Sequence, residues 1–105
     1  AAEMTLNAVL GISDNLIPQV FALHQNYPNP FNPVTTIRYD LPKISNFSLI
    51  VYDIKGSEVA KLYNGSQVPG YYTIAWDASE HSSGVYFVKM IAGEFVNTQK
   101  LMLVK

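Results

Sequence analysis

Hydrophobic and polar residues alternate along most of the chain, and turn residues interrupt this alternation roughly every ten residues. In the stretch TTIRYDL, residues 35–41, the apolar side chains of Ile37, Tyr39 and Leu41 share one face and polar side chains occupy the other. This period of two is that of a half-buried β-strand. Residues 46–53, NFSLIVYD, alternate in the same way, but both of their faces are fairly apolar, which is typical of a central strand. No stretch has the periodicity of a convincing amphipathic helix.

Five further stretches are predicted to form strands, which brings the total to seven. They are residues 18–24, 57–63, 71–77, 84–93 and 94–105. The strongest turn signals between strands are residues 53–56, 64–65 and 69–70, where a glycine is able to adopt a positive φ. Seven short antiparallel strands separated by such turns predict an all-β fold, an immunoglobulin-like or fibronectin-III-like sandwich.

The parity of each predicted strand indicates which side chains enter the core. In residues 57–63 we expect Lys61 and Tyr63 to share a face with Val59. In residues 71–77, Trp76 is expected to be an anchor between the two sheets. The residues of the stretch 84–93 that are expected to face inward are Tyr86, Val88 and Met90.

Two regions are predicted along the chain. Residues 1–20 are expected to be a linker, or an extra edge strand from the preceding region, because apolar residues recur at alternate positions from Met4 to Leu10. Residues 21–105 are expected to form one domain, and a chain of 105 residues with 49% hydrophobic content can build a core for it. The first residues lack the basic n-region of a signal peptide. Because the sequence opens on Ala1 and not on Met, we expect a piece of a longer polypeptide, and removal of an initiator methionine is the alternative.

Charge and composition narrow the classes of partner. Seven basic and eight acidic residues give a formal net charge of −1, so the overall charge favours neither nucleic acid nor an anionic membrane as a partner. No apolar run approaches the ~20 residues of a membrane-spanning helix, and we expect no membrane insertion. Because the sequence has no cysteine, it has no disulfide, thiolate zinc site or cysteine nucleophile.

Residues with catalytic or metal-binding potential are sparse. The two histidines, His24 and His81, belong to no recognisable motif, and no nucleophile elbow, HExxH pair or glycine-rich phosphate loop occurs. Asp77 and Glu80, with the carbonyl groups of their loop, offer oxygen ligands for calcium, but a solvated loop is the simpler interpretation. We therefore expect no enzyme activity, no cofactor and no metal.

Residue chemistry alone leaves two other functions open. One is a structural immunoglobulin-like accessory domain of an extracellular hydrolase. The other is a carbohydrate-binding module of such an enzyme, which would expose a row of aromatic side chains. Seven tyrosines are available for such a row, and Tyr71 has outward parity in its predicted strand.

The segment QNYPNPFNP, residues 25–33, differs in composition from the rest of the chain. It holds three prolines and three asparagines, and each proline fixes φ near −65° and lacks a backbone donor. The residues before the prolines are restricted to extended geometry, and asparagine side chains satisfy backbone groups in such turns. We expect a rigid crossover that caps one end of the sandwich, with Phe31 closing the end of the core.

A set of motifs carries a resemblance to a known family. QNYPNPFNPVTTIRYDLP is followed by LIVYDIKGSEV, PGYYTIAWDA, SSGVYFVKM and a final KLMLVK. In this order the motifs closely resemble the C-terminal sorting domains of the type IX (Por) secretion system, from about Phe21 to Lys105. The domain also looks like the FlgD-type immunoglobulin-like fold, which agrees with the predicted strands.

The resemblance implies a non-catalytic sorting signal that directs a covalently attached N-terminal cargo across the outer membrane. The implied partners are the outer-membrane type IX machinery and its sortase-like protease, which removes the domain from many cargoes. The implied location is the periplasm in transit, and then the cell surface or the medium.

The family motifs fall on four groups of residues. They are Pro28, Asn29, Pro30 and Phe31, continuing into Asn32 and Pro33; Pro69, Gly70 and Tyr72; Gly84, Val85, Tyr86 and Lys89; and Lys100, Leu101, Val104 and Lys105. The resemblance places recognition mainly in the last two groups and architecture in the first. We also expect the final strand to lie at a sheet edge with unpaired backbone groups, where a partner adds a strand beside Lys100 and Lys105.

Overall fold

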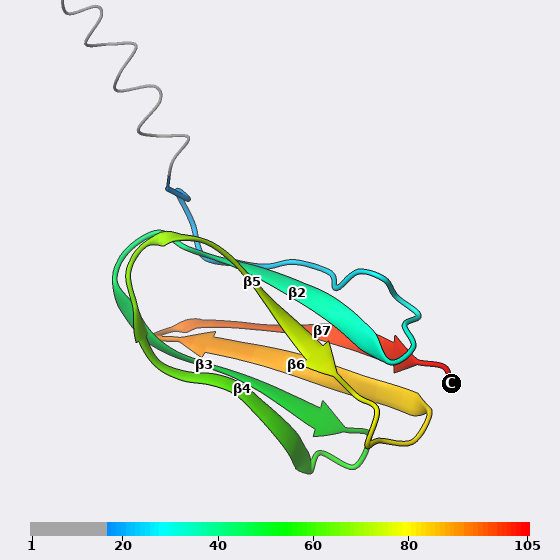
Figure 1. Ribbon diagram of the computed structural model, residues 1–105. Helices are drawn as coiled ribbons and strands as arrows, with labels where there is room; N and C mark the ends of the chain where they lie inside the picture. Colours follow the sequence, from blue (N-terminus) through cyan, green and yellow to red (C-terminus); the bar gives the residue numbers. More distant parts are fainter. Residues whose placement is uncertain (1–16) are drawn as a thin grey trace, which may run out of the picture.

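The computed structural model describes residues 17–105, which fold into seven β-strands in two layers (Figure 1). The strands are β1 (Ala22–Leu23), β2 (Val34–Leu41), β3 (Ser45–Asp53), β4 (Glu58–Gln67), β5 (Gly70–Asp77), β6 (Gly84–Ala92) and β7 (Phe95–Leu103). One sheet has the order β1-β2-β5 and the other has the order β4-β3-β6-β7, and all strand pairs are antiparallel. The predicted all-β sandwich of about seven antiparallel strands is therefore confirmed.

Alternate side chains of the strands are buried between the two sheets, as predicted for β2 and for Tyr86, Val88 and Met90 of β6. Those without any exposed surface are Ile37 and Leu41 of β2, Leu49 and Val51 of β3, Val88 and Met90 of β6, and Leu101 of β7. Burying one such side chain stabilises a fold by about 1.5–3 kcal/mol relative to leaving it in water. The inner faces of the two sheets therefore form the apolar core.

Trp76 of β5 lies between the sheets near one end of the sandwich and is only 4% exposed. The centroid of its ring is 5.8 Å from that of Phe31 and 5.4 Å from that of Tyr86, which it meets edge-on. Tilted and edge-on contacts are the arrangements that aromatic rings prefer. The predictions that Trp76 anchors the core and that Phe31, 2% exposed, closes its end are both confirmed.

The turn predicted at residues 64–65 is wrong, because β4 continues through both residues to Gln67. Gly65 pairs with Phe47 of β3 at a φ of +156°, a conformation that residues with a side chain rarely adopt. The ring of Tyr63 also lies 3.8 Å from the place that a Cβ on Gly65 would take. The conformational freedom of Gly65, which predicted a turn, instead allows β4 to continue with an irregular backbone next to the Tyr63 ring.

The prediction that Lys61 and Tyr63 share a face is also wrong. The register between β3 and β4 shifts at two places, between Leu49 and Ile50 and between Val51 and Tyr52. As a result Lys61 pairs with Ile50, whose side chain points away from the core, whereas Tyr63 pairs with the buried Leu49. A bulge of this kind reverses the parity of the residues beyond it, and periodicity alone does not locate a bulge.

β1 is shorter than the strand predicted for residues 18–24, since only Ala22–Leu23 pairs with β2. Before it, Phe21 stacks on Phe95 of the other sheet at 5.5 Å, which draws the chain away from β2. The edge strand predicted between Met4 and Leu10 lies outside the described residues. Among the residues that the structure describes, no helix has the length and apolar character needed to cross a membrane.

Candidate functional site

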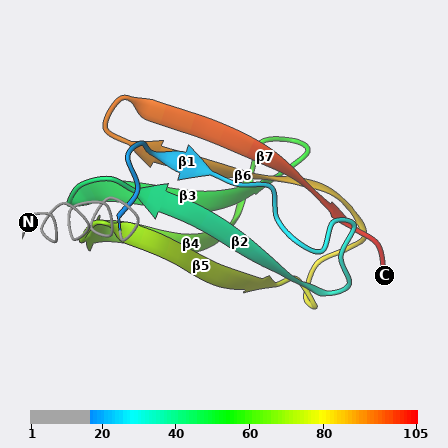
Figure 2. The same ribbon diagram turned by 90° about the horizontal axis from the view of Figure 1, so that it is seen from above.

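The proline-rich segment, residues 25–33, is a strap that joins the two sheets at one end of the sandwich. Tyr27 extends the three-stranded sheet by exchanging two backbone hydrogen bonds with Thr36, of 3.0 and 2.9 Å. Phe31 extends the four-stranded sheet, because its amide donates to the Met102 carbonyl at 2.9 Å and its carbonyl accepts from the Val104 amide at 3.0 Å. Figure 2 shows the strap running beside the end of β7 to the same end of the molecule as the last residue.

The composition of the strap matches these contacts. Its ladder donors are the amides of Tyr27 and Phe31, and prolines occupy positions 28, 30 and 33, from which no amide is required. The side chain of Asn29 accepts the Met102 amide at 2.9 Å, and Gln25 donates to the Lys100 carbonyl at 3.0 Å. Side chains thus bind the backbone of β7 where the strap itself does not pair.

The strap changes the expectation that the final strand offers an open edge. From Lys100 to Val104 the outer backbone groups of β7 bond to strap residues, so they are not available to a partner in the folded chain. The expectation of unpaired backbone in this part of the strand is therefore wrong. The physical reason is that the side chains of Gln25 and Asn29 and the backbone of Phe31 together cover an edge that a sheet would otherwise expose.

The strap is fixed by one buried polar group. Asn26 is 2% exposed, and its amide nitrogen donates to the Thr35 hydroxyl at 2.8 Å and to the Pro28 carbonyl at 3.2 Å. The Thr35 hydroxyl donates to the same carbonyl at 2.8 Å. A buried and satisfied network of this kind specifies a single conformation. Sequence analysis missed the role of Asn26, although it had noted that asparagines satisfy backbone groups in turns.

The second motif group also packs inside the structure. Tyr72 stacks on Tyr39 at 5.4 Å and donates its hydroxyl to the Val68 carbonyl at 2.6 Å. A Cβ on Gly70 would lie 3.3 Å from the Tyr72 ring, so glycine is the residue that lets this ring pack closely. Burial raises the pKa of Tyr39 above its ordinary 10.0, although the hydrogen bond that it donates to Gln67 opposes the shift.

The third motif group divides between the two faces of β6. Tyr86 is 7% exposed, packs on Trp76, and donates its hydroxyl to the Ser82 carbonyl at 2.7 Å, four residues earlier. Gly84 begins the strand. Lys89 has the opposite parity, pairs with Ile50 of β3 and Thr98 of β7, and lies half-buried on the outer face of the four-stranded sheet.

The last motif group ends on a tethered lysine. Lys105 donates through Nζ to the Ser79 carbonyl at 2.7 Å and through its amide to the Ser83 hydroxyl at 2.9 Å. The side chain and the amide of Ser79 both bond to the Asp77 carboxylate, and these bonds, aided by the nearby Lys105 charge, lower the pKa of Asp77 below 3.8. Val104, next to Lys105, is 53% exposed.

The carboxylate that sequence analysis considered for calcium therefore binds its own loop. Asp77 accepts from Ser79, two residues later, in the manner of a turn residue. Within residues 17–105, no three His, Cys, Asp or Glu side chains gather closely enough to hold a metal ion. The calcium interpretation gains no further ligand from the fold.

The outer face of the four-stranded sheet brings the third and fourth motif groups together. Phe87 of β6 lies directly opposite Lys100 of β7, and Val85 lies opposite Met102. Residues opposite each other in an antiparallel pair have side chains on the same face, with Cβ atoms ~5 Å apart. Two motifs that are separated in sequence therefore form one continuous surface with Lys89 in the middle strand.

This surface, the lysine face, holds three lysines among apolar side chains and some polar ones, which include Ser48, Glu58, Asn64 and Thr98. The lysines are Lys61, Lys89 and Lys100, and the apolar residues are Ile50, Tyr52, Val85, Phe87, Ile91, Val96 and Met102. Ile91 is 38% exposed and Val96 is 54% exposed, and the other apolar residues are half-buried. The described chain forms only two layers of strands, so none of its strands covers this face.

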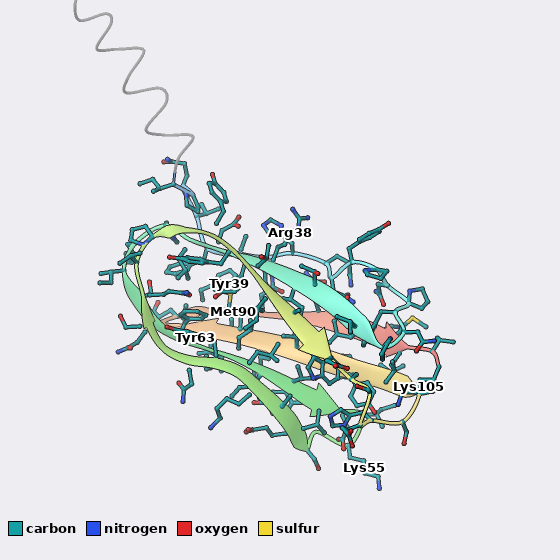
Figure 3. All side chains as sticks on the ribbon, in the orientation of Figure 1. Arg38, Tyr39, Lys55, Tyr63, Met90 and Lys105 are labelled. Atoms are coloured by element: carbon teal, nitrogen blue, oxygen red, sulfur yellow. The ribbon has the colours of Figure 1, made fainter. Side chains whose placement is uncertain are left out.

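The outer face of the three-stranded sheet is more polar along β2, as is usual for a sheet facing water, although Val34 and Tyr71 are exposed on it. Thr36, Arg38 and Asp40 of β2 point outward, and Figure 3 shows Arg38 directed away from the sandwich while Tyr39 and Met90 point between the sheets. The Nε2 atom of His24 forms a hydrogen bond of 2.9 Å with the Asp40 carboxylate on this face.

Two hollows lie outside these surfaces. One, of about 620 Å³, is at the end of the sandwich away from the strap and is lined partly by Phe21, Ile44 and Phe95. The other, of about 270 Å³, lies on the three-stranded sheet beside His24 and Asp40. The lining of the larger hollow also includes Lys43 and Glu94.

Comparison with known proteins agrees with the motifs. The family model of the secretion system C-terminal sorting domain matches residues 25–105. The chain therefore belongs to this family, the sorting domains of the type IX secretion system, and the resemblance inferred from the motifs is confirmed. No curated protein matches the chain significantly. Membership of the family implies export to the cell surface or the medium and interaction with the type IX system.

Proposed function

We propose that the chain is a non-catalytic sorting signal that carries an attached N-terminal cargo across the outer membrane through the type IX secretion system. The observation that supports this most is the family match over residues 25–105, which spans the strap and every later strand. The fold also gives each motif a physical role. Residues of the first two groups pack and bond within the sandwich, whereas Lys89 and Lys100 of the last two groups lie on one outer face of it.

The positions of the two ends suit a signal attached behind a cargo. The described chain begins at one end of the sandwich, and the last residue lies at the opposite end beside the strap (Figures 1 and 2). A cargo joined before residue 1 would leave the strap and the lysine face accessible. We assign residues 1–20 to the linker and 21–105 to the domain, and propose that the sortase-like protease cuts before the sandwich after transit through the periplasm.

The proposed site residues fall into two sets with different roles. Those that maintain the fold are Pro28, Asn29, Pro30, Phe31, Gly70, Tyr72, Gly84 and Tyr86. Those accessible to the machinery are Lys89, Lys100, Val104 and Lys105. Under this proposal, substitutions in the first set reduce export through loss of the fold, and substitutions in the second reduce it while the domain stays folded.

An export assay tests the proposal. A periplasmic reporter is fused ahead of residues 1–105 in a host with a working type IX system, and the reporter alone is the control. The proposal predicts reporter at the surface and in the medium only when the domain is present. A reporter that remains in the periplasm with a folded domain, while a native cargo of that host is exported, would contradict it. Point variants are preferable to deletion of residues 101–105, because Leu101 and Leu103 are core residues.

A further inference from the structure

The lysine face has a composition that folding does not require. An antiparallel sheet that faces water on one side normally alternates apolar residues inside with polar residues outside, as β2 does. On β3 and β6 most outward positions are instead apolar: Ile50, Tyr52 and Phe87 are half-buried there and Ile91 is 38% exposed, while Ser48 and Lys89 are polar. Contiguous exposed apolar residues on a protein surface mark an interaction site.

The charge on this face is as distinctive as its apolar content. Every lysine that lies within a strand of residues 17–105, namely Lys61, Lys89 and Lys100, is on this face, although the whole chain has a net charge of −1. The sheet has two acidic residues, Asp53 and Glu58, and both lie at the hairpin end between β3 and β4. The Asp53 carboxylate accepts the amides of its own turn. The centre of the face is therefore cationic.

The arrangement of the lysines favours a protein partner over a lipid bilayer. Lys89 lies on a central strand, between Ile50 and Thr98, and is half-buried by its neighbours. A face that inserts into lipid has an apolar centre with lysines at its rim, because an ammonium group in the hydrocarbon region is costly. A protein surface is able to place a carboxylate opposite Lys89 and apolar side chains opposite Phe87.

We propose that the lysine face is the docking surface of this domain, and that its partner is a protein surface with carboxylates set among apolar side chains. The inference rests on the proposed function, because it takes the partner to be a component of the export machinery. The apolar residues supply contact area and the lysines supply orientation and rate of encounter. Lys89 and Lys100, from the third and fourth motif groups, then act at one surface.

A pair of charge-matched variants tests the proposal. K89E/K100E reverses two charges on the face, and K43E/K55E reverses two exposed lysines in the β2–β3 and β3–β4 connections, with the same change in net charge. Both are fused behind the reporter as residues 1–105, and their thermal unfolding is measured on the purified chains. We expect K89E/K100E to lower export by about tenfold or more, because like charges then oppose each other at the interface. K43E/K55E should be exported like the parent chain.

Each other outcome decides the matter. Parental export of K89E/K100E, or an equal loss in K43E/K55E, overturns the docking surface and leaves the sorting function standing. Failure of the parent chain itself to be exported overturns both. If K89E/K100E does not fold, K89Q/K100Q takes its place: reduced export supports the proposal and unchanged export overturns it. Sedimentation of the purified chain with phosphatidylglycerol–phosphatidylcholine vesicles, lost in K89E/K100E, would overturn the assignment of a protein partner.

Discussion

Phe31 shows how one side chain of the strap acts on the whole core. It is 2% exposed, its ring packs against Trp76, and its backbone pairs with β7. We expect Phe31→Ala to lower the free energy of unfolding by about 3–5 kcal/mol, because it removes a buried ring and leaves a cavity. Denaturant unfolding measures this change. Tyr27→Ala, at a strap residue that is 79% exposed, is the control and should change stability by no more than ~0.5 kcal/mol. Equal losses in the two variants would contradict the role given to Phe31.

The carboxylate of Asp77, in the connection before β6, makes the stability of the domain depend on pH. Its pKa lies below 3.8 in the folded chain because Ser79 donates two hydrogen bonds to the carboxylate. A lowered folded pKa gives stability that is present above the unfolded value and is lost as the pH falls through the folded pKa. Asp77→Asn should therefore be less stable than the parent at pH 7, and the difference should narrow in acid below about pH 4.

Thermal unfolding at a series of pH values measures this effect. Glu80→Gln is the control for the loss of a carboxylate from the same loop. A stability difference for Asp77→Asn that is constant from pH 7 down to strong acid would show that the hydrogen bonds to Ser79 do not depend on the ionised carboxylate.

At the scale of elements, the strap closes one end of the sandwich, because its backbone pairs with both sheets. Asn29 is its principal side-chain contact to β7, through the Met102 amide and, at 3.4 Å, the Lys100 carbonyl. We expect Asn29→Ala to cost about 1–3 kcal/mol, because it leaves a backbone donor of β7 unsatisfied. Hydrogen exchange at the Met102 amide should become faster at the same time.

Asn32→Ala is the matched control for this change, since Asn32 is an exposed asparagine in the same strap. It should leave both the unfolding free energy and the exchange rate of Met102 close to those of the parent. If the two variants behave alike, the Asn29 side chain does not hold the strap on β7, and the backbone bonds of Phe31 and the bond from Gln25 remain as its contacts.

The strands and their inward faces were predictable from sequence wherever the alternation is regular. β2 and β6 keep a period of two along their inner faces, so Ile37 and Val88 were predictable as core residues, whereas both faces of β3 are fairly apolar and its inner face depends on the pairing of the strands. β4 could not be predicted in the same way, because bulges opposite β3 reverse its parity and Gly65 continues a strand. Local sequence does not encode these register shifts.

The candidate surface was only half visible in the sequence. The family motifs pointed to Lys89 and Lys100, and NFSLIVYD was seen to be apolar on both faces. Their meeting on one face, with Phe87 opposite Lys100, depends on the pairing of β6 with β7, which is a long-range property. Lys61 was missed because its face depends on a bulge. The covering of β7 by the strap was missed because hydrogen bonds between residues some 70 positions apart leave no local pattern.

At the scale of the whole molecule, the residues that build the sandwich differ from those that we propose for recognition. The strap, the core and the tyrosines of the motif groups build a sandwich in which the strap covers the outer edge of β7 from Lys100 to Val104, and the outer face of the four-stranded sheet carries Lys89 and Lys100. The described chain begins at the end of the sandwich opposite to the strap and the last residue, and a cargo would join at that end (Figure 1).

The measurement that tests the central claim most directly is the dependence of export on the type IX machinery. A reporter fused ahead of residues 1–105 is expressed in a competent host and in an isogenic strain that lacks the outer-membrane machinery, and reporter is quantified in the periplasm, at the surface and in the medium. The account predicts surface and medium signal in the first strain and periplasmic retention in the second. Equal export from both strains, or retention in both while a native cargo is exported by the competent host, would contradict it.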